Sequence, residues 1–141
     1  MKNWLSIGLI TLLFNCPSYA EQLVVDERQQ LYKKIEDDSE LLEDFVDDAD
    51  WVKSAELANR LAKDVLKLKQ LFPEHSKGDG RSKTKIWANW PDFENKLDNW
   101  SFLYLQVENA SKVRDINKLE HAVDTANSTC RSCHMKYRSL W

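Results

Sequence analysis

Residues that break or bend regular structure are scarce in this chain of 141 residues, which has three glycines and three prolines. An all-β protein needs turn residues roughly every 8–12 positions, so this composition argues against one. With 43% hydrophobic residues, enough apolar surface exists for a core, which excludes collagen-like and broadly disordered chains. The length fits one domain, with or without a leader.

The chain also has few cysteines and no excess of positive charge. Three cysteines, Cys16 near the start and Cys130 and Cys133 near the end, are too few for a disulfide framework. The net charge is −3 and no basic stripe is present, so we expect no nucleic-acid partner. Residues 36–50 instead hold nine carboxylates. Such a block is typical of a solvated face, and a second interpretation is that it attracts a basic redox partner.

Long apolar runs are absent after the first 20 residues. Residues 1–20 start with Lys2, continue with an apolar run over 5–14, and end in Ser18-Tyr19-Ala20, the pattern of a signal peptide cleaved after Ala20. The run is shorter than the ~20 residues needed to span a bilayer. We therefore expect no stable membrane insertion.

The mature chain, residues 21–141, is expected to be a single exported domain in the periplasm. The alternative is a lipid anchor on Cys16. Asn15 disfavours this alternative, because a small residue usually precedes a lipidated cysteine.

Four stretches of the mature chain repeat apolar residues every three or four positions, which predicts amphipathic helices over about 22–47, 50–72, 91–109 and 115–137. The expected core row of the first stretch is Val24, Leu31, Ile35, Leu42 and Phe45. Pro73 ends the second stretch. These stretches favour an all-α fold, an antiparallel four-helix bundle. The alternative fold has three helices, the first of which is broken.

A loop is predicted over residues 73–89, between the second and third helices. It holds two glycines and a cluster of four cations, Lys77, Arg81, Lys83 and Lys85. Its length indicates a functional or cofactor-covering role rather than a plain connection.

The residues that carry chemistry are Cys130-Arg131-Ser132-Cys133-His134. C-x-x-C-H is the attachment motif of a c-type haem. Each cysteine forms a thioether with one vinyl group, and the histidine coordinates the iron. We therefore predict one covalent haem c near the end of the last helix, held by Cys130 and Cys133, with His134 as an axial ligand.

Three other interpretations compete with haem. A zinc site needs about four ligands, and only His75 and His121 are available outside the motif, far away in sequence. A thioredoxin-like redox pair needs a βαβ context. A disulfide between Cys130 and Cys133 would leave His134 unexplained.

A haem at the end of the last helix of a bundle resembles the class II cytochromes c, the cytochrome c′ family. The resemblance covers essentially the whole mature chain and is most specific over residues 130–138, CRSCHMKYR. Weaker likeness lies in Leu71-Phe72-Pro73-Glu74 and in Lys83-Thr84-Lys85-Ile86-Trp87, ahead of the third helix.

Family members differ in the second axial ligand of the iron, which is either a methionine or an open position. The methionines here are Met1, in the leader, and Met135, beside His134 and unable to reach the opposite face. His121 lies thirteen residues before His134 on the same helix, ~20 Å away at 1.5 Å per residue. His75 is the remaining candidate, and an exposed loop histidine is its ordinary interpretation. An open, high-spin site is favoured.

The resemblance also implies which residues surround the haem. Arg28 matches the family arginine near a propionate, which places Tyr32 over the iron, or Leu31 if the alignment shifts by one residue. Trp87 matches a tryptophan packed near the haem. Tyr137 and Arg138 match the family's ending, with the arginine beside the haem histidine; a solvated cation at a helix C-terminus is the alternative for Arg138.

These observations predict a periplasmic haem protein that carries single electrons, binds a diatomic gas (NO or CO), or does both, without turning over a substrate. An unidentified redox protein and the gas would be its partners, and the sequence leaves open whether it forms a homodimer. The alternative is a small peroxidase-like enzyme using the open iron, which the lack of a histidine in the first helix disfavours.

Overall fold

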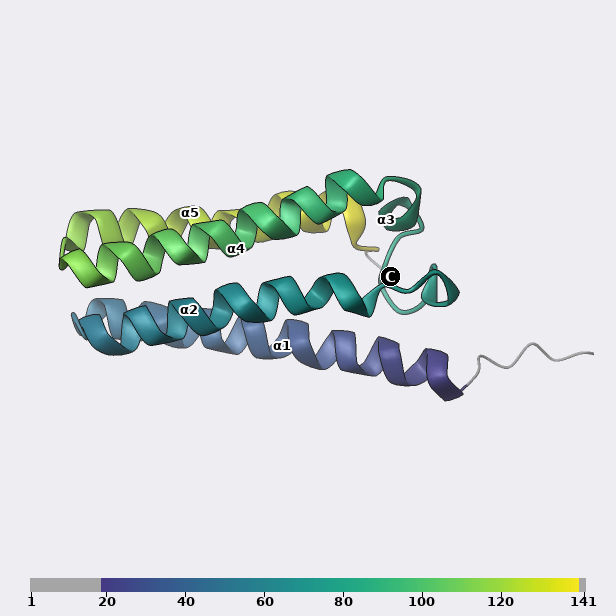
Figure 1. The fold of residues 1–141 in the computed structure, drawn as a ribbon, viewed down its shortest axis with the longest axis horizontal. Coiled ribbons are helices and arrows are strands. Elements are labelled where there is room, and N and C mark those ends of the chain that lie inside the picture. Colours follow the sequence, from purple (N-terminus) through teal and green to yellow (C-terminus); the bar gives the residue numbers. More distant parts are fainter. Residues whose placement is uncertain (1–18, 140–141) are drawn as a thin grey trace, which may run out of the picture.

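The computed structural model describes residues 19–139, and Figure 1 shows four long helices lying side by side in an antiparallel bundle. In chain order they are α1 (Tyr19–Asp47), α2 (Trp51–Lys67), α4 (Trp90–Val113) and α5 (Ile116–Tyr137), with the short α3 (Lys85–Ala88) before α4. The predicted all-α four-helix bundle is confirmed. No helix in the described part of the chain is long and apolar enough to cross a membrane. The leader and Cys16 fall on residues 1–20, of which 1–18 lie outside the described residues.

Local sequence signals set the turns of the bundle. Asp50 precedes α2, and its carboxylate accepts a hydrogen bond from the Lys53 amide at 3.1 Å; Asp115 does the same for α5. Such caps satisfy amide donors that have no partner inside the helix. Ala49 and Arg114 adopt left-handed backbone angles (φ 53° and 55°), which reverse the chain within a few residues. Short reversals of this kind make consecutive helices antiparallel neighbours.

The segment between α2 and α4 is more ordered than predicted. The second helix does not run to Phe72 as an α-helix: it ends at Lys67 and continues as a 3₁₀ turn, η1 (Leu68–Leu71). With three residues per turn, Leu68 and Leu71 align on one side, and both are buried. The predicted loop also contains η2 (Glu74–Ser76) and α3, and α4 extends four residues beyond the predicted end at Asn109.

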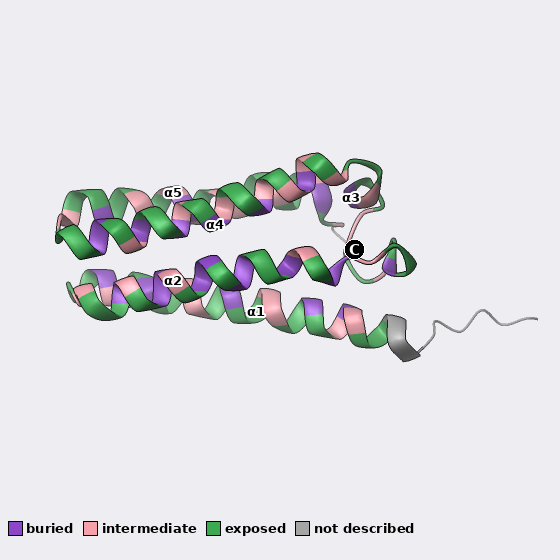
Figure 2. Cartoon of the chain, in the orientation of Figure 1, coloured by how far each residue is buried: buried purple, intermediate pink, exposed green. Residues whose placement is uncertain are grey.

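Buried residues line the inner faces of all four long helices (Figure 2). In α1 the buried apolar row differs from the predicted one by a residue at either end. Val25 and Val46 are buried, whereas Val24 and Phe45 are half-buried, and Leu31, within the predicted row, is half-buried too. Arg28, three residues after Val25, is also buried, although a hydropathy pattern assigns a charged residue to the surface.

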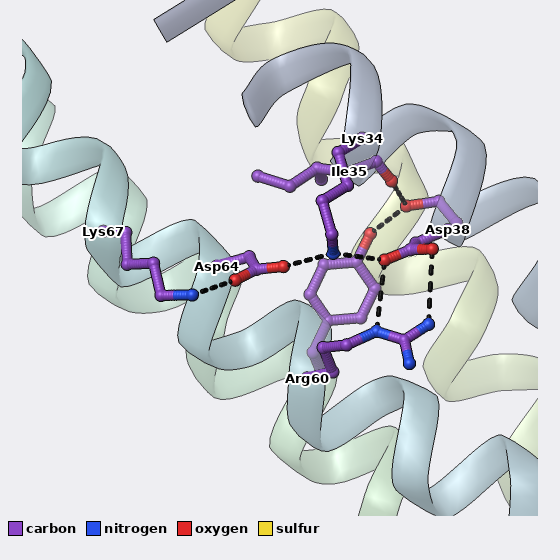
Figure 3. Close-up of polar contacts among 8 residues, drawn as sticks. Lys34, Ile35, Asp38, Arg60, Asp64 and Lys67 are labelled. Atoms are coloured by element: carbon purple, nitrogen blue, oxygen red, sulfur yellow. Dashed lines mark hydrogen bonds and ion pairs between the residues drawn. The ribbon is translucent and has the colours of Figure 1, made fainter. Parts of the chain in front are cut away.

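A charged cluster joins α1 to α2 (Figure 3). The Asp64 carboxylate is 4% exposed and accepts hydrogen bonds from Lys34 Nζ and Lys67 Nζ, each at 2.6 Å. Lys34 also contacts Asp38 at 2.7 Å, and Arg60 donates two bonds to that same carboxylate at 3.3 Å. A buried carboxylate needs such partners, because leaving it unpaired is costly.

Burial opposes ionisation of Asp64, but the hydrogen bonds from Lys34 and Lys67 outweigh it and lower the pKa of this carboxyl. A carboxylate whose pKa is lower in the folded than in the unfolded chain stabilises the fold above its unfolded pKa, about 4. That stabilisation is lost as the pH falls through the folded pKa.

We expect Asp64→Ala to lower the free energy of unfolding by about 1–3 kcal/mol at pH 7, because it leaves two lysines without their shared acceptor. The matched control is Asp98→Ala, which removes an exposed ion pair with Lys69 and should cost under about 0.5 kcal/mol. Urea unfolding measures both, and the deficit of Asp64→Ala should shrink below about pH 4. Equal losses in the two variants would contradict the role given to Asp64.

Candidate haem site

The C-x-x-C-H motif lies in the last two turns of α5, which ends at Tyr137. Cys130, Cys133 and His134 are spaced by three and four residues, so they share one face of the helix. Both cysteines are half-buried, and both are free thiols rather than a disulfide. Burial raises the pKa of each thiol. The structure therefore holds two unlinked thiols one helical turn apart, with the imidazole beside them.

The first half of α1 faces this motif across the bundle. Tyr32 lies within electrostatic reach of Cys133 and Cys130, and of Arg28 one turn earlier. One turn later, Glu36 lies within reach of Cys130 and His134. Burial, reinforced by the two cysteines and opposed by Arg28, raises the pKa of Tyr32 far above its ordinary value. Its phenol is therefore neutral at physiological pH.

Leu31 lies on a different side of α1. It lines a surface groove between α1 and the end of α2, together with Lys34, Lys67 and Leu71. Of the two residues that the sequence left open as the cover of the iron, the structure places Tyr32, not Leu31, toward the cysteines.

Arg28 is buried, and its guanidinium holds the segment that follows α2. Nη1 donates to the Leu71 carbonyl oxygen at 3.1 Å, and Nη2 donates to that of Asp79 at 3.0 Å. The same group lies over the Phe72 ring, 4.6 Å from its centroid. Desolvation lowers the pKa of Arg28, and Tyr32 and Asp79 oppose that shift. The expected contact with a haem propionate stays a prediction, and the loop contacts are a further role that sequence reasoning missed.

Trp87 and Tyr137 complete the packing at this end. Trp87 Nε1 donates to the carbonyl oxygens of Phe72 and Pro73 at 3.0 and 3.1 Å, so α3 is tied to the end of α2. Tyr137 is buried edge-on against Phe93, with ring centroids 5.1 Å apart, and its hydroxyl contacts Asp92. The aromatic residues thus hold the last turn of α5 and the loop in place.

Arg138 ends α5 at the surface, and its amide donates to the His134 carbonyl oxygen at 3.0 Å. Desolvation, together with the positive charges of Arg138 and Arg81, lowers the pKa of His134, and Glu36 partly opposes this. A lowered pKa favours the neutral imidazole, the form that binds a metal.

The other candidate ligands lie at the surface. His75 is exposed in η2, His121 is exposed on α5, and Met135 is 72% exposed. Within residues 19–139, no group of three or more His, Cys, Asp or Glu side chains gathers into a site for a bare metal ion. The chemistry of this end is therefore that of two thiols and one imidazole.

These residues fit a covalently held haem. The thiols are unlinked, His134 follows directly on the same face with its neutral form favoured, and a neutral phenol stands across from them on α1. The fold and the site together define a helical-bundle haem protein of the c type.

The comparisons with known proteins agree. The family model described as cytochrome C' matches residues 23–138, so the chain belongs to the cytochrome c′ family. The cofactor of this family is a covalently attached haem c, and Cys130 and Cys133 are present to hold it. No curated relative is similar enough in sequence to match the chain.

Solved structures share the fold at low sequence identity. A structure described as cytochrome c′ has 19% identity and a TM-score of 0.76, covering 84% of this chain and 97% of its own. Recombinant native cytochrome c prime from Alcaligenes xylosoxidans has 20% identity and a TM-score of 0.76, covering 84% and 96%. A ferrous variant of the Alcaligenes xylosoxidans protein with bound NO has 18% identity and a TM-score of 0.77, covering 86% and 97%.

Proposed function

We propose that this chain is a periplasmic, exported haem protein that carries single electrons and binds a diatomic gas at a five-coordinate, high-spin iron, without turning over a substrate. The observation that carries the proposal is the residue facing the motif from α1: Tyr32 lies there, whereas His75 is in η2 and His121 is on α5 itself. Support also comes from relatives, since one cytochrome c prime of similar fold is described with bound NO.

When bound, the haem supplies an iron that changes between the ferric and ferrous states and that takes a small ligand on its free side. His134 would hold it from α5. Tyr32 would cover the free side as a neutral, half-buried phenol, and its bulk restricts what reaches that side. An anion would have to give up its hydration in this desolvated space, which is costly. We therefore expect carbon monoxide to bind the ferrous protein readily and azide to bind the ferric protein poorly.

The residues here do not favour peroxidase chemistry, which needs a positioned acid–base group near the iron. The described part of α1, residues 19–47, contains no histidine. Its buried arginine, Arg28, already donates to two backbone carbonyl groups. The histidine–arginine pair typical of a peroxidase is therefore missing from the described part of α1, where the acid–base groups nearest the motif are Tyr32 and Glu36. We therefore propose a carrier and gas-binding protein rather than an enzyme.

Replacing Tyr32 with alanine should raise the rate of carbon monoxide binding to the ferrous protein about tenfold, equivalent to about 1.4 kcal/mol of the binding barrier. The reason is that the side chain covers the free side. Leu31→Ala is the matched control: it lies one residue away but lines the α1–α2 groove, so its rate should stay at the wild-type value. Stopped-flow mixing measures both rates. Acceleration by Leu31→Ala and not by Tyr32→Ala would show that α1 presents its other side to the haem.

The intact mass of protein exported from a host with a cytochrome c maturation system should equal residues 21–141 plus one haem, and should keep this value after acid–acetone extraction. Thioether bonds survive that extraction, whereas a haem held by coordination alone is removed. Cys130→Ser/Cys133→Ser should lose the added mass and keep the same N-terminus. A mass that includes residues 1–20 would contradict the export proposal, and a lipid on Cys16 would contradict cleavage after Ala20 and replace the unanchored form by a membrane-anchored one. Neither result would touch the haem proposal.

A further inference from the structure

Two segments far apart in sequence bring their cations to one surface around His134. Ser82 and Arg138 form an antiparallel bridge, the Lys83 amide donates to the Tyr137 carbonyl oxygen at 2.9 Å, and the Ser139 amide donates to that of Arg81 at 2.8 Å. Lys83 Nζ also donates to the Met135 carbonyl oxygen at 3.2 Å. Residues 81–83 are therefore fastened along the end of α5, and Lys85 follows two residues later at the start of α3.

We call the resulting surface the basic rim. Its members share a positive charge and a place beside the haem motif; they are Arg81, Lys83, Lys85, Arg131 and Arg138. Residues 77–85 and 130–139 together hold seven Lys and Arg against a single Asp. Both Arg81 and Arg138 lie within electrostatic reach of the His134 imidazole. Arg81 and Arg138 thus lie beside the turn that holds the axial ligand, and Arg131 lies three residues before His134 on the same helix.

Three of the five rim cations have no carboxylate partner within residues 19–139. Lys85, Arg131 and Arg138 are exposed, and none has an ion pair among the described residues. Two of the nearby carboxylates are already paired: Asp92 pairs with Lys136 at 2.8 Å, and Glu74 pairs with Lys77 at 3.2 Å. Exposed cations that lack a carboxylate partner attract the opposite sign over roughly a Debye length.

Negative charge is concentrated in α1 and in the turn that follows it. The nine carboxylates of residues 36–50, a stretch with no Lys or Arg, begin at Glu36 near His134 and run along α1 to the α1–α2 turn. In Figure 1 this turn lies at the end of the bundle opposite the C-terminus. With 22 residues, α5 is ~33 Å long, so the acidic turn lies far from the haem motif. A partner that exchanges electrons must approach the iron, which makes the acidic turn a poor place for it.

We propose that the basic rim is the docking surface for an acidic redox protein. In the reductive direction the partner would lose one electron, and the haem iron would change from ferric to ferrous. This inference rests on the proposed electron-transfer function and adds the sign and place of the partner surface. This assignment differs from the second interpretation of residues 36–50, in which those carboxylates attract a basic redox partner.

Two small oxidants of opposite charge test the inference on the ferrous holoprotein: anionic hexacyanoferrate(III) and cationic tris(phenanthroline)cobalt(III). The full chain carries a net charge of −3, and residues 21–141 are one unit more negative because they lack Lys2. The protein as a whole should therefore repel the anion, so that added salt speeds the reaction. The basic rim predicts the reverse, a rate with hexacyanoferrate(III) that falls about tenfold between about 10 and 200 mM salt. The rate with the cobalt complex should rise or stay level.

Two variants with the same change in net charge separate local from overall electrostatics. Lys85→Glu lies on the rim, whereas Lys118→Glu lies at the start of α5, near the opposite end of the bundle. Lys85→Glu should lower the low-salt rate with hexacyanoferrate(III) about threefold and flatten its salt dependence, and Lys118→Glu should leave both near the wild-type values. Polyglutamate, a probe for an acidic protein surface, should slow the wild-type reaction more than that of Lys85→Glu.

The outcomes are distinct. A hexacyanoferrate(III) rate that rises with salt, or equal effects of the two variants, would overturn the docking inference and leave electron transfer standing. A ferrous protein that reacts with neither oxidant at any salt concentration would overturn the electron-transfer proposal and, with it, this inference. Co-sedimentation with phosphatidylglycerol vesicles that Lys85→Glu abolishes, without any effect of polyglutamate, would replace the acidic protein by a lipid surface.

Discussion

Buried charge on two sides of α1 fixes which of its residues faces the haem motif. Arg28 requires acceptors in the segment after α2 and finds them at the carbonyl groups of Leu71 and Asp79. Asp64 on α2 requires donors and finds one in Lys34 of α1. Because a buried charge is costly without its partners, both sets of contacts must form together. A rotation of α1, or a slide by one turn, would break at least one of them, so Tyr32 is held toward Cys130 and Cys133.

This constraint also explains which features the sequence predicts well. Periodic apolar residues locate the four long helices, and C-x-x-C-H identifies the haem chemistry, because both signals are local. Periodicity did not place Arg28 and Asp64 in the interior, since a charged residue is assigned to the surface unless its partners are known. Apart from Lys67, which is three residues from Asp64, those partners lie 30 to 51 residues away in sequence. The core row in α1 also starts one residue later than predicted, at Val25 rather than Val24.

The choice between Leu31 and Tyr32 shows most clearly what helical periodicity cannot predict. Consecutive residues on a helix point about 100° apart, and both lie at the border of the apolar row, so spacing alone cannot separate them. The groove between α1 and α2 takes Leu31, which leaves Tyr32 for the α5 side. Helical spacing could have predicted that Glu36, four residues after Tyr32, lies on the same side of α1. No feature of the sequence predicts that the segment starting at Arg81 joins the end of α5. The charge asymmetry of the bundle depends on that joining.

The central claim is that His134 is the only protein ligand of the iron, with Tyr32 as a non-coordinating cover. Electronic absorption and electron paramagnetic resonance spectra of the purified protein test it most directly, in the ferric and ferrous states at neutral pH. We expect high-spin, five-coordinate iron in both states, and conversion of the ferrous form by carbon monoxide. A low-spin spectrum in both states would contradict the account, and loss of that spectrum in His75→Ala would identify the missing ligand.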